Sequence, residues 1–122
     1  MKNQDFSPGS RLSSFGHAFS GIQKFFQEEP NARIHLLATV VVLILAAYLN
    51  ASRIEWILLT IVIGMVWAAE IFNTAIERIM DFISPHIDPK VKLIKDMSAA
   101  AVLVCAVLAA AVGLIIFIPK II

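Results

Sequence analysis

Residues 70–81 read Glu70-Ile71-Phe72-Asn73-Thr74-Ala75-Ile76-Glu77-Arg78-Ile79-Met80-Asp81, and they follow directly on a long apolar run. A helix turns by about 100° per residue. The spacing of three, four and four residues therefore predicts a single helix face for Glu70, Asn73, Glu77 and Asp81. Because ionisable side chains are costly in hydrocarbon, they usually mark function there. The stretch predicts a functional site at membrane depth, and the alternative is a polar patch that only specifies helix packing.

The composition around this stretch indicates a membrane protein. Of the 122 residues, 59% are hydrophobic and 16% are charged, whereas a soluble domain carries about 25% charged residues. The length predicts one domain. A single cysteine excludes an intramolecular disulfide.

The chain before the spans divides into a tail and a helix. Residues 1–10 are polar, contain Pro8 and Gly9, and are predicted to form a flexible tail with Ser10 as a cap for the next helix. Residues 11–29 carry an apolar stripe spaced by three and four residues: Leu12, Phe15, Phe19, Ile22 and Phe26. This segment is too polar to span a bilayer, so we predict an amphipathic helix on the membrane surface. The alternative is a helix packed on the protein's own bundle.

Three apolar runs predict three transmembrane helices, at about residues 32–49, 54–82 and 97–118. The fold class is therefore all-α, an integral membrane helical bundle. The last run is rich in alanine, and small residues let helix backbones approach closely. Three helices make a thin bundle, so we expect a homo-oligomer, with Ala106 and Ala110 facing a neighbouring subunit.

The distribution of positive charge predicts the orientation. Eight of the ten lysines and arginines lie before or at the start of the first span or around the 80–96 loop, and only Arg53 and Lys120 lie on the other side. Because cytoplasmic loops are enriched in these residues, we expect a cytoplasmic N-terminus in a multi-pass protein. The polar stripe then opens towards the cytoplasm.

Carboxylates, an amide and a lysine are thus predicted to gather at one membrane depth. Oxygen ligands suit Mg²⁺ held together with phosphates, and Lys95 suits a phosphate group. A buried carboxylate such as Glu70 is placed to take a hydroxyl proton. The set predicts phosphoryl transfer to a lipid hydroxyl, although no phosphate-binding glycine loop is present. The rival prediction is a proton-coupled transporter or channel with Glu70 as relay, and Asp96 has a second interpretation as a helix cap.

The motif from Ala69 to Glu77, followed by Asp81 and by Lys95-Asp96-Met97-Ser98-Ala99-Ala100-Ala101, resembles the small bacterial diacylglycerol kinases. The resemblance extends over about residues 11–120. It implies a homotrimer, each subunit with three transmembrane helices and an amphipathic N-terminal helix, in the bacterial cell (inner) membrane. It also implies ATP with Mg²⁺ and a membrane lipid alcohol as substrates, and no nucleic-acid partner. One branch of the family phosphorylates diacylglycerol and the other undecaprenol.

The resemblance also implies roles for individual residues. Glu70 would be the general base on the lipid hydroxyl, with Asn73 orienting groups at the transfer point and Ser98 on the lipid substrate. Glu29 and Glu77 would hold the metal with the nucleotide phosphates. The nucleotide would also contact Lys95, Asp96, Arg11 and His17.

Two further stretches bear on the lipid acceptor and on the nucleotide loop that the resemblance implies. Glu29-Pro30-Asn31-Ala32-Arg33-Ile34-His35 resembles the pattern of the undecaprenol branch, which makes undecaprenol the preferred acceptor and diacylglycerol the second. The nucleotide loop departs from the family: it reads Ser84-Pro85-His86-Ile87-Asp88 where Ser-x-Glu-Tyr-His is usual. His86 and Asp88 are still predicted to contact nucleotide. His35 is interpreted as interfacial packing at the mouth of the first span.

Overall fold

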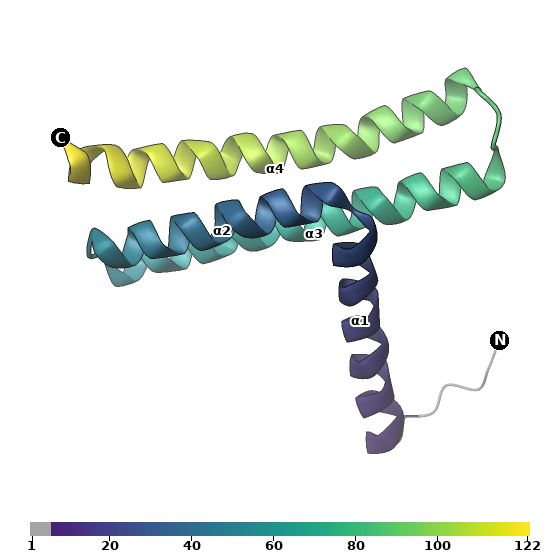
Figure 1. Cartoon of the computed structure of the whole chain (residues 1–122), viewed down its shortest axis with the longest axis horizontal. Helices are drawn as coiled ribbons and strands as arrows, with labels where there is room; N and C mark the ends of the chain where they lie inside the picture. The colour runs from purple at the N-terminus through teal and green to yellow at the C-terminus, as the bar shows by residue number, and fades with distance from the viewer. Residues whose placement is uncertain (1–5) are drawn as a thin grey trace. The chain divides into compact units, whose positions relative to one another are not determined.

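The computed structural model describes residues 6–122. Over this range the chain forms four α-helices: α1 (Pro8–Glu28), α2 (Pro30–Tyr48), α3 (Arg53–Ile83) and α4 (Pro89–Ile121) (Figure 1). Residues 1–5 lie outside the described part, and with them Lys2 and the first half of the predicted tail. The all-α fold class is confirmed.

The chain divides into two compact units, residues 1–34 and residues 35–122. In the first unit, α1 begins at Pro8 because Ser7 caps it: the Ser7 hydroxyl accepts a hydrogen bond from the Ser10 backbone N–H. Proline is favoured at the first helical position, where its missing N–H costs nothing. Residues 8–10 therefore belong to the helix, and Ser7 holds the capping position that was predicted for Ser10.

The stripe predicted on α1 is largely exposed within its unit. Leu12, Phe15 and Phe19 are each about two thirds exposed, while Phe25 is buried. A helix with such a face is suited to a membrane surface, which remains the prediction for this segment.

A tight turn joins α2 to α3 in the second unit. Asn50 adopts a positive φ of 53°, a conformation that asparagine tolerates better than most residues. Ser52 then caps α3 in a reciprocal capping box, in which Glu55 accepts from the Ser52 backbone N–H and the Ser52 hydroxyl accepts from the Glu55 N–H.

Helices α3 and α4 run antiparallel and side by side along most of their length (Figure 1). Ion pairs join them near both ends: Lys95 Nζ to Asp81 Oδ1, and Lys120 Nζ to Glu55 Oε2 at 3.0 Å. Near the second of these pairs, Ala46 of α2 packs with Leu59 of α3 and Phe117 of α4 in a buried cluster. The register of the two long helices is therefore defined at both ends.

Three helices are long and apolar enough to cross a membrane, namely α2, α3 and α4, as the sequence predicted. Most of their apolar side chains point outwards and are exposed in the single chain. Helix α4 begins at Pro89, well before the predicted apolar span 97–118, because Asp88 caps it and Pro89 follows at its first position. With 33 residues, α4 measures about 50 Å and exceeds the hydrocarbon thickness of about 30 Å.

Candidate active site

The polar stripe of α3 forms as its spacing predicted, and its members differ in burial. Glu70 is buried at 8% exposure, Asn73 and Glu77 are half-buried, and Asp81 is exposed. Burial therefore decreases towards the α3–α4 connection, where polar ligands would enter. A lipid hydroxyl is expected at the Glu70 end and phosphates at the Asp81 end.

Glu70 has a partner that the sequence interpretation missed. The Nε2 atom of His35 lies 2.7 Å from Glu70 Oε1. His35 therefore makes a polar contact in addition to the packing that the sequence predicted, since its ring also packs on Trp67. A signal was available: His35 is the only histidine or acidic residue of its apolar run, and ionisable groups within a membrane usually pair with one another.

Asn73 lies between Glu70 and Glu77 on the stripe and is bonded to Glu77. Its Nδ2 donates to Glu77 Oε1 at 3.4 Å, whereas its Oδ1 is buried and finds no hydrogen-bond partner in the described chain. The hydroxyl of Ser98 on α4 is buried and unpartnered in the same sense. Buried polar atoms are normally satisfied, at a cost of about 1–3 kcal/mol when they are not. Both residues were predicted to face substrate, and their unmet hydrogen-bonding capacity is consistent with that role.

The connection between α3 and α4 borders an open hollow of about 320 Å³ with several charged residues in its lining. Its lining includes five predicted residues of the nucleotide site or the stripe: Asp81, His86, Asp88, Lys95 and Asp96. Lys95 is bound to Asp81, and Asp96 is bound to Lys92 at 2.5 Å. A phosphate group entering here would meet Lys95 and compete with the Asp81 carboxylate for it.

The residue that caps α4 differs from the one predicted from the sequence. Asp88 caps α4 by accepting a hydrogen bond from the Lys90 backbone N–H at 2.8 Å. Asp96 lies two turns inside the helix, so its alternative role as a cap is wrong. His86 is exposed, and its backbone carbonyl accepts from the Ser84 hydroxyl at 3.4 Å. The cap engages one of the two carboxylate oxygens of Asp88, Oδ1.

The remaining predicted residues lie in the first unit. Arg11 and His17 are exposed on α1, and the Ser13 hydroxyl lies 3.4 Å from His17 Nε2. Glu29 is half-buried and ends α1, with its backbone N–H donating to the Phe25 carbonyl. An extended backbone at Glu29 turns the chain before Pro30 begins α2.

The donor set fits a magnesium ion that arrives with its substrate. Among the described residues, no three histidine, cysteine or acidic side chains gather to enclose a metal. Mg²⁺ is commonly bound by one or two carboxylates together with substrate phosphates. Glu77, which is half-buried and bonded to an amide rather than to a cation, is suited to that arrangement.

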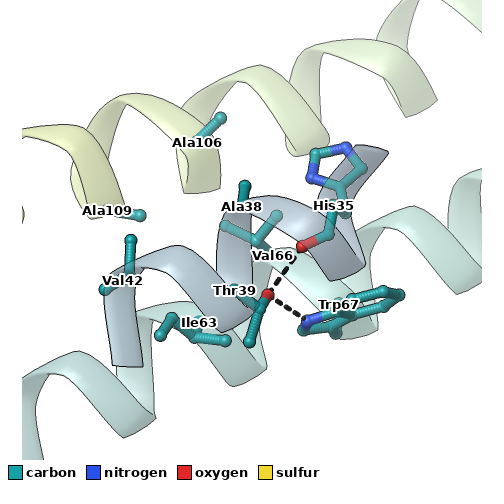
Figure 2. A pocket seen from close by; sticks show the side chains of 9 residues that line it. All are labelled: His35, Ala38, Thr39, Val42, Ile63, Val66, Trp67, Ala106 and Ala109. Carbon is teal, nitrogen blue, oxygen red and sulfur yellow. Dashed lines mark hydrogen bonds between the residues drawn. The ribbon is translucent and has the colours of Figure 1, made fainter. Parts of the chain in front are cut away.

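A second, largely apolar cavity of about 190 Å³ lies between α2, α3 and α4, with His35 at its wall (Figure 2). Ala106 and Ala109 line it from α4, and Thr39 and Trp67 supply its other polar atoms. Ala106 therefore faces its own chain. Of the two positions predicted to face a neighbouring subunit, the single chain favours Ala110, which is exposed, over Ala106.

The function of this site is indicated by the known proteins to which the chain is similar. The model of the family described as prokaryotic diacylglycerol kinase matches residues 16–117. The chain belongs to the prokaryotic diacylglycerol kinase family. The matched segment contains the α3 stripe, His35 and the Lys95-Asp96 pair, so the candidate site lies entirely within the part that defines the family, apart from Arg11.

Curated relatives of the prokaryotic diacylglycerol kinase family include enzymes of two named activities. Undecaprenol kinase of Bacillus subtilis (strain 168) is 40% identical over 109 residues, which cover 89% of each chain. Diacylglycerol kinase of Synechocystis is 32% identical over 88% of this chain and 62% of its own, and that of Escherichia coli K12 is 28% identical over 80% of each.

This membership makes the chain a lipid kinase, a multi-pass bacterial membrane protein that acts on nucleotide and lipid substrates. It does not favour the rival transporter prediction.

Proposed function

We propose that this kinase transfers the γ-phosphate of ATP to undecaprenol at the cytoplasmic face of the cell membrane, as a homotrimer with a cytoplasmic N-terminus. The observation that carries the chemistry is the buried Glu70 carboxylate on a stripe that leads to the lysine-bearing hollow. The higher identity to undecaprenol kinase than to the diacylglycerol kinases supports the acceptor. The pattern from Glu29 to His35 supports it as well.

In the proposed reaction, Glu70 accepts the proton of the lipid hydroxyl as its oxygen attacks the γ-phosphorus. The bond from the γ-phosphorus to the β,γ-bridging oxygen breaks, and ADP leaves. Asn73 orients the groups between Glu70 and Glu77, and Lys95 attracts the phosphates after leaving Asp81. Mg²⁺, held by Glu29 and Glu77 with the phosphates, would neutralise charge that develops on the transferred group.

The other predicted site residues are proposed to contact the nucleotide or the lipid without taking part in the transfer itself. Arg11, His17, His86, Asp88 and Asp96 are proposed to contact the nucleotide around the hollow and the surface helix. Ser98 is proposed to give its buried hydroxyl to the lipid substrate, because no partner in the described chain occupies it. Residues 11–122 are proposed to constitute one lipid kinase membrane domain.

The test is a transfer assay with radiolabelled ATP on purified protein in vesicles that contain undecaprenol or diacylglycerol. We expect label on undecaprenol at higher kcat/KM than on diacylglycerol, and loss of transfer after removal of Mg²⁺ with a chelator. Glu70→Gln in the same vesicles is the background control. Preferred labelling of diacylglycerol would overturn the acceptor assignment, and absence of label on either lipid would overturn the kinase reaction proposed here.

A further inference from the structure

The imidazole of His35 contacts the buried Glu70 carboxylate. Nε2 of His35 and Oε1 of Glu70 are 2.7 Å apart, and their side chains are 28% and 11% exposed. A carboxylate accepts the hydrogen of an N–H at this distance, and such charge-assisted bonds are short and strong. The contact joins α2 to α3 across 35 positions of sequence.

His35 is itself held by a second set of contacts (Figure 2). The Thr39 hydroxyl donates to the His35 backbone carbonyl at 2.7 Å, and Trp67 Nε1 donates to the Thr39 hydroxyl oxygen at 3.0 Å. The rings of His35 and Trp67 meet edge to face with centroids 6.2 Å apart. These contacts restrict both the backbone and the ring of His35, and Trp67 lies one helical turn before Glu70 on α3.

We propose that His35 is the positioning residue for Glu70, and that Thr39 and Trp67 hold His35 for that task. Its Nε2–H engages Oε1 of Glu70, which leaves Oε2 directed to the lipid hydroxyl. This inference rests on the proposed function, in which Glu70 takes the hydroxyl proton. A reacting group must be held accurately, since a displacement of about 1 Å costs roughly 10²-fold in rate.

The contact is tested first without activity. The chain has three histidines, so ¹⁵N spectra of histidine-labelled protein in vesicles contain three ring systems. The His35 signal, identified by its loss in His35→Gln, should shift in Glu70→Gln, while those of His17 and His86 stay unchanged. An unchanged His35 signal in Glu70→Gln would overturn the contact, whether or not the protein phosphorylates a lipid.

The positioning role is tested by steady-state kinetics. His35→Leu removes the donor, and kcat should fall by about 10- to 100-fold while KM for ATP stays within about twofold. His35→Gln keeps an amide N–H near the position of Nε2 and should restore a large part of the loss. In the Glu70→Gln background, His35→Leu should have no further effect, because the group that it positions is gone.

Thr39→Val tests the support of His35, and Thr60→Val is its matched control. Both hydroxyls donate to the carbonyl four residues earlier. Trp67 Nε1 donates to the Thr39 hydroxyl but not to the Thr60 hydroxyl. Thr39→Val should lower kcat by about threefold to tenfold and Thr60→Val should not change it.

Three outcomes would overturn the role: equal loss of activity in His35→Gln and His35→Leu, full additivity of His35→Leu with Glu70→Gln, or wild-type kcat in His35→Leu. Failure of the proposed function itself looks different, since wild-type protein would then label no lipid while the spectra still report the contact.

Discussion

Glu70 and Glu77 share one face of α3 but have different surroundings. Glu70 is buried and bonded to His35, whereas Glu77 is half-buried and bonded to Asn73. Two helical turns separate them by about 10 Å along the axis. At the residue scale, this separation is the basis for the proposed division between proton transfer at Glu70 and metal-nucleotide binding at Glu77.

Glu70→Gln should lower kcat by about 10²-fold or more, with Kd for ATP-Mg²⁺ changed little, because the amide cannot accept the hydroxyl proton. Glu77→Gln should instead weaken ATP binding in a manner that depends on Mg²⁺ concentration. Calorimetric titration at several Mg²⁺ concentrations measures the second effect and initial rates the first. If Glu70→Gln loses metal-dependent binding while Glu77→Gln keeps it, the two roles are reversed.

Lys95 is the predicted phosphate ligand, and Asp81 holds its Nζ in the structure. Lys95→Met should raise Kd for ATP by about tenfold, the worth of one charge-assisted contact. Lys90→Met is the control, because Lys90 lies on the first turn of the same helix but outside the lining of the hollow. Equal effects of the two substitutions would mean that only the total positive charge of this end matters.

At the element scale, α2, α3 and α4 pack together at the end far from the α3–α4 connection, and this packing aligns the helices that carry the site. Leu59 is 1% exposed and belongs to the cluster with Ala46, Ile116 and Phe117. Burial in a membrane gains little from leaving water, so these contacts act mainly through close packing. The ion pair of Lys120 with Glu55 joins α4 to α3 at the same end.

Leu59→Ala should lower the free energy of unfolding by about 2 kcal/mol, at the low end for buried leucines, because a cavity remains in the cluster. Leu58→Ala is the matched control: it removes the same atoms from a neighbouring position that is 42% exposed. Unfolding in mixed micelles, followed by circular dichroism, measures both. Comparable losses would show that an unseen neighbour packs on Leu58 as tightly as the cluster packs on Leu59.

At the scale of the whole molecule, much apolar surface of α4 is exposed in the single chain, including Ala110. Ala106, in contrast, lines the internal cavity. Small exposed residues permit close approach of a neighbouring helix. The proposed trimer therefore has a candidate contact at Ala110 and not at Ala106.

Ala110→Phe should reduce crosslinked trimers in native membranes and lower activity in parallel, because the larger ring separates the helices. Ala106→Phe should leave assembly intact and lower the unfolding midpoint, since its ring enters the chain's own cavity. Crosslinking and light scattering in detergent measure assembly. Wild-type protein that crosslinks only as a monomer would remove the proposal of a trimer.

Local patterns were sufficient for the helices and for the stripe. The three spans follow from apolar runs, and the common face of Glu70, Asn73 and Glu77 follows from helical periodicity, which depends only on separation in sequence. The family motif added roles to these residues. Hydropathy placed the start of α4 too late, since the helix extends beyond the apolar run to its cap at Asp88.

Only the tertiary structure decided which residues meet across helices. The pairs of His35 with Glu70 and of Lys95 with Asp81 depend on how α2, α3 and α4 are aligned along their axes. A shift of α3 by a single turn, about 5.4 Å, would separate both pairs and leave every local pattern unchanged. That alignment comes from side-chain packing between helices, including the cluster around Leu59, and no spacing within one segment contains it.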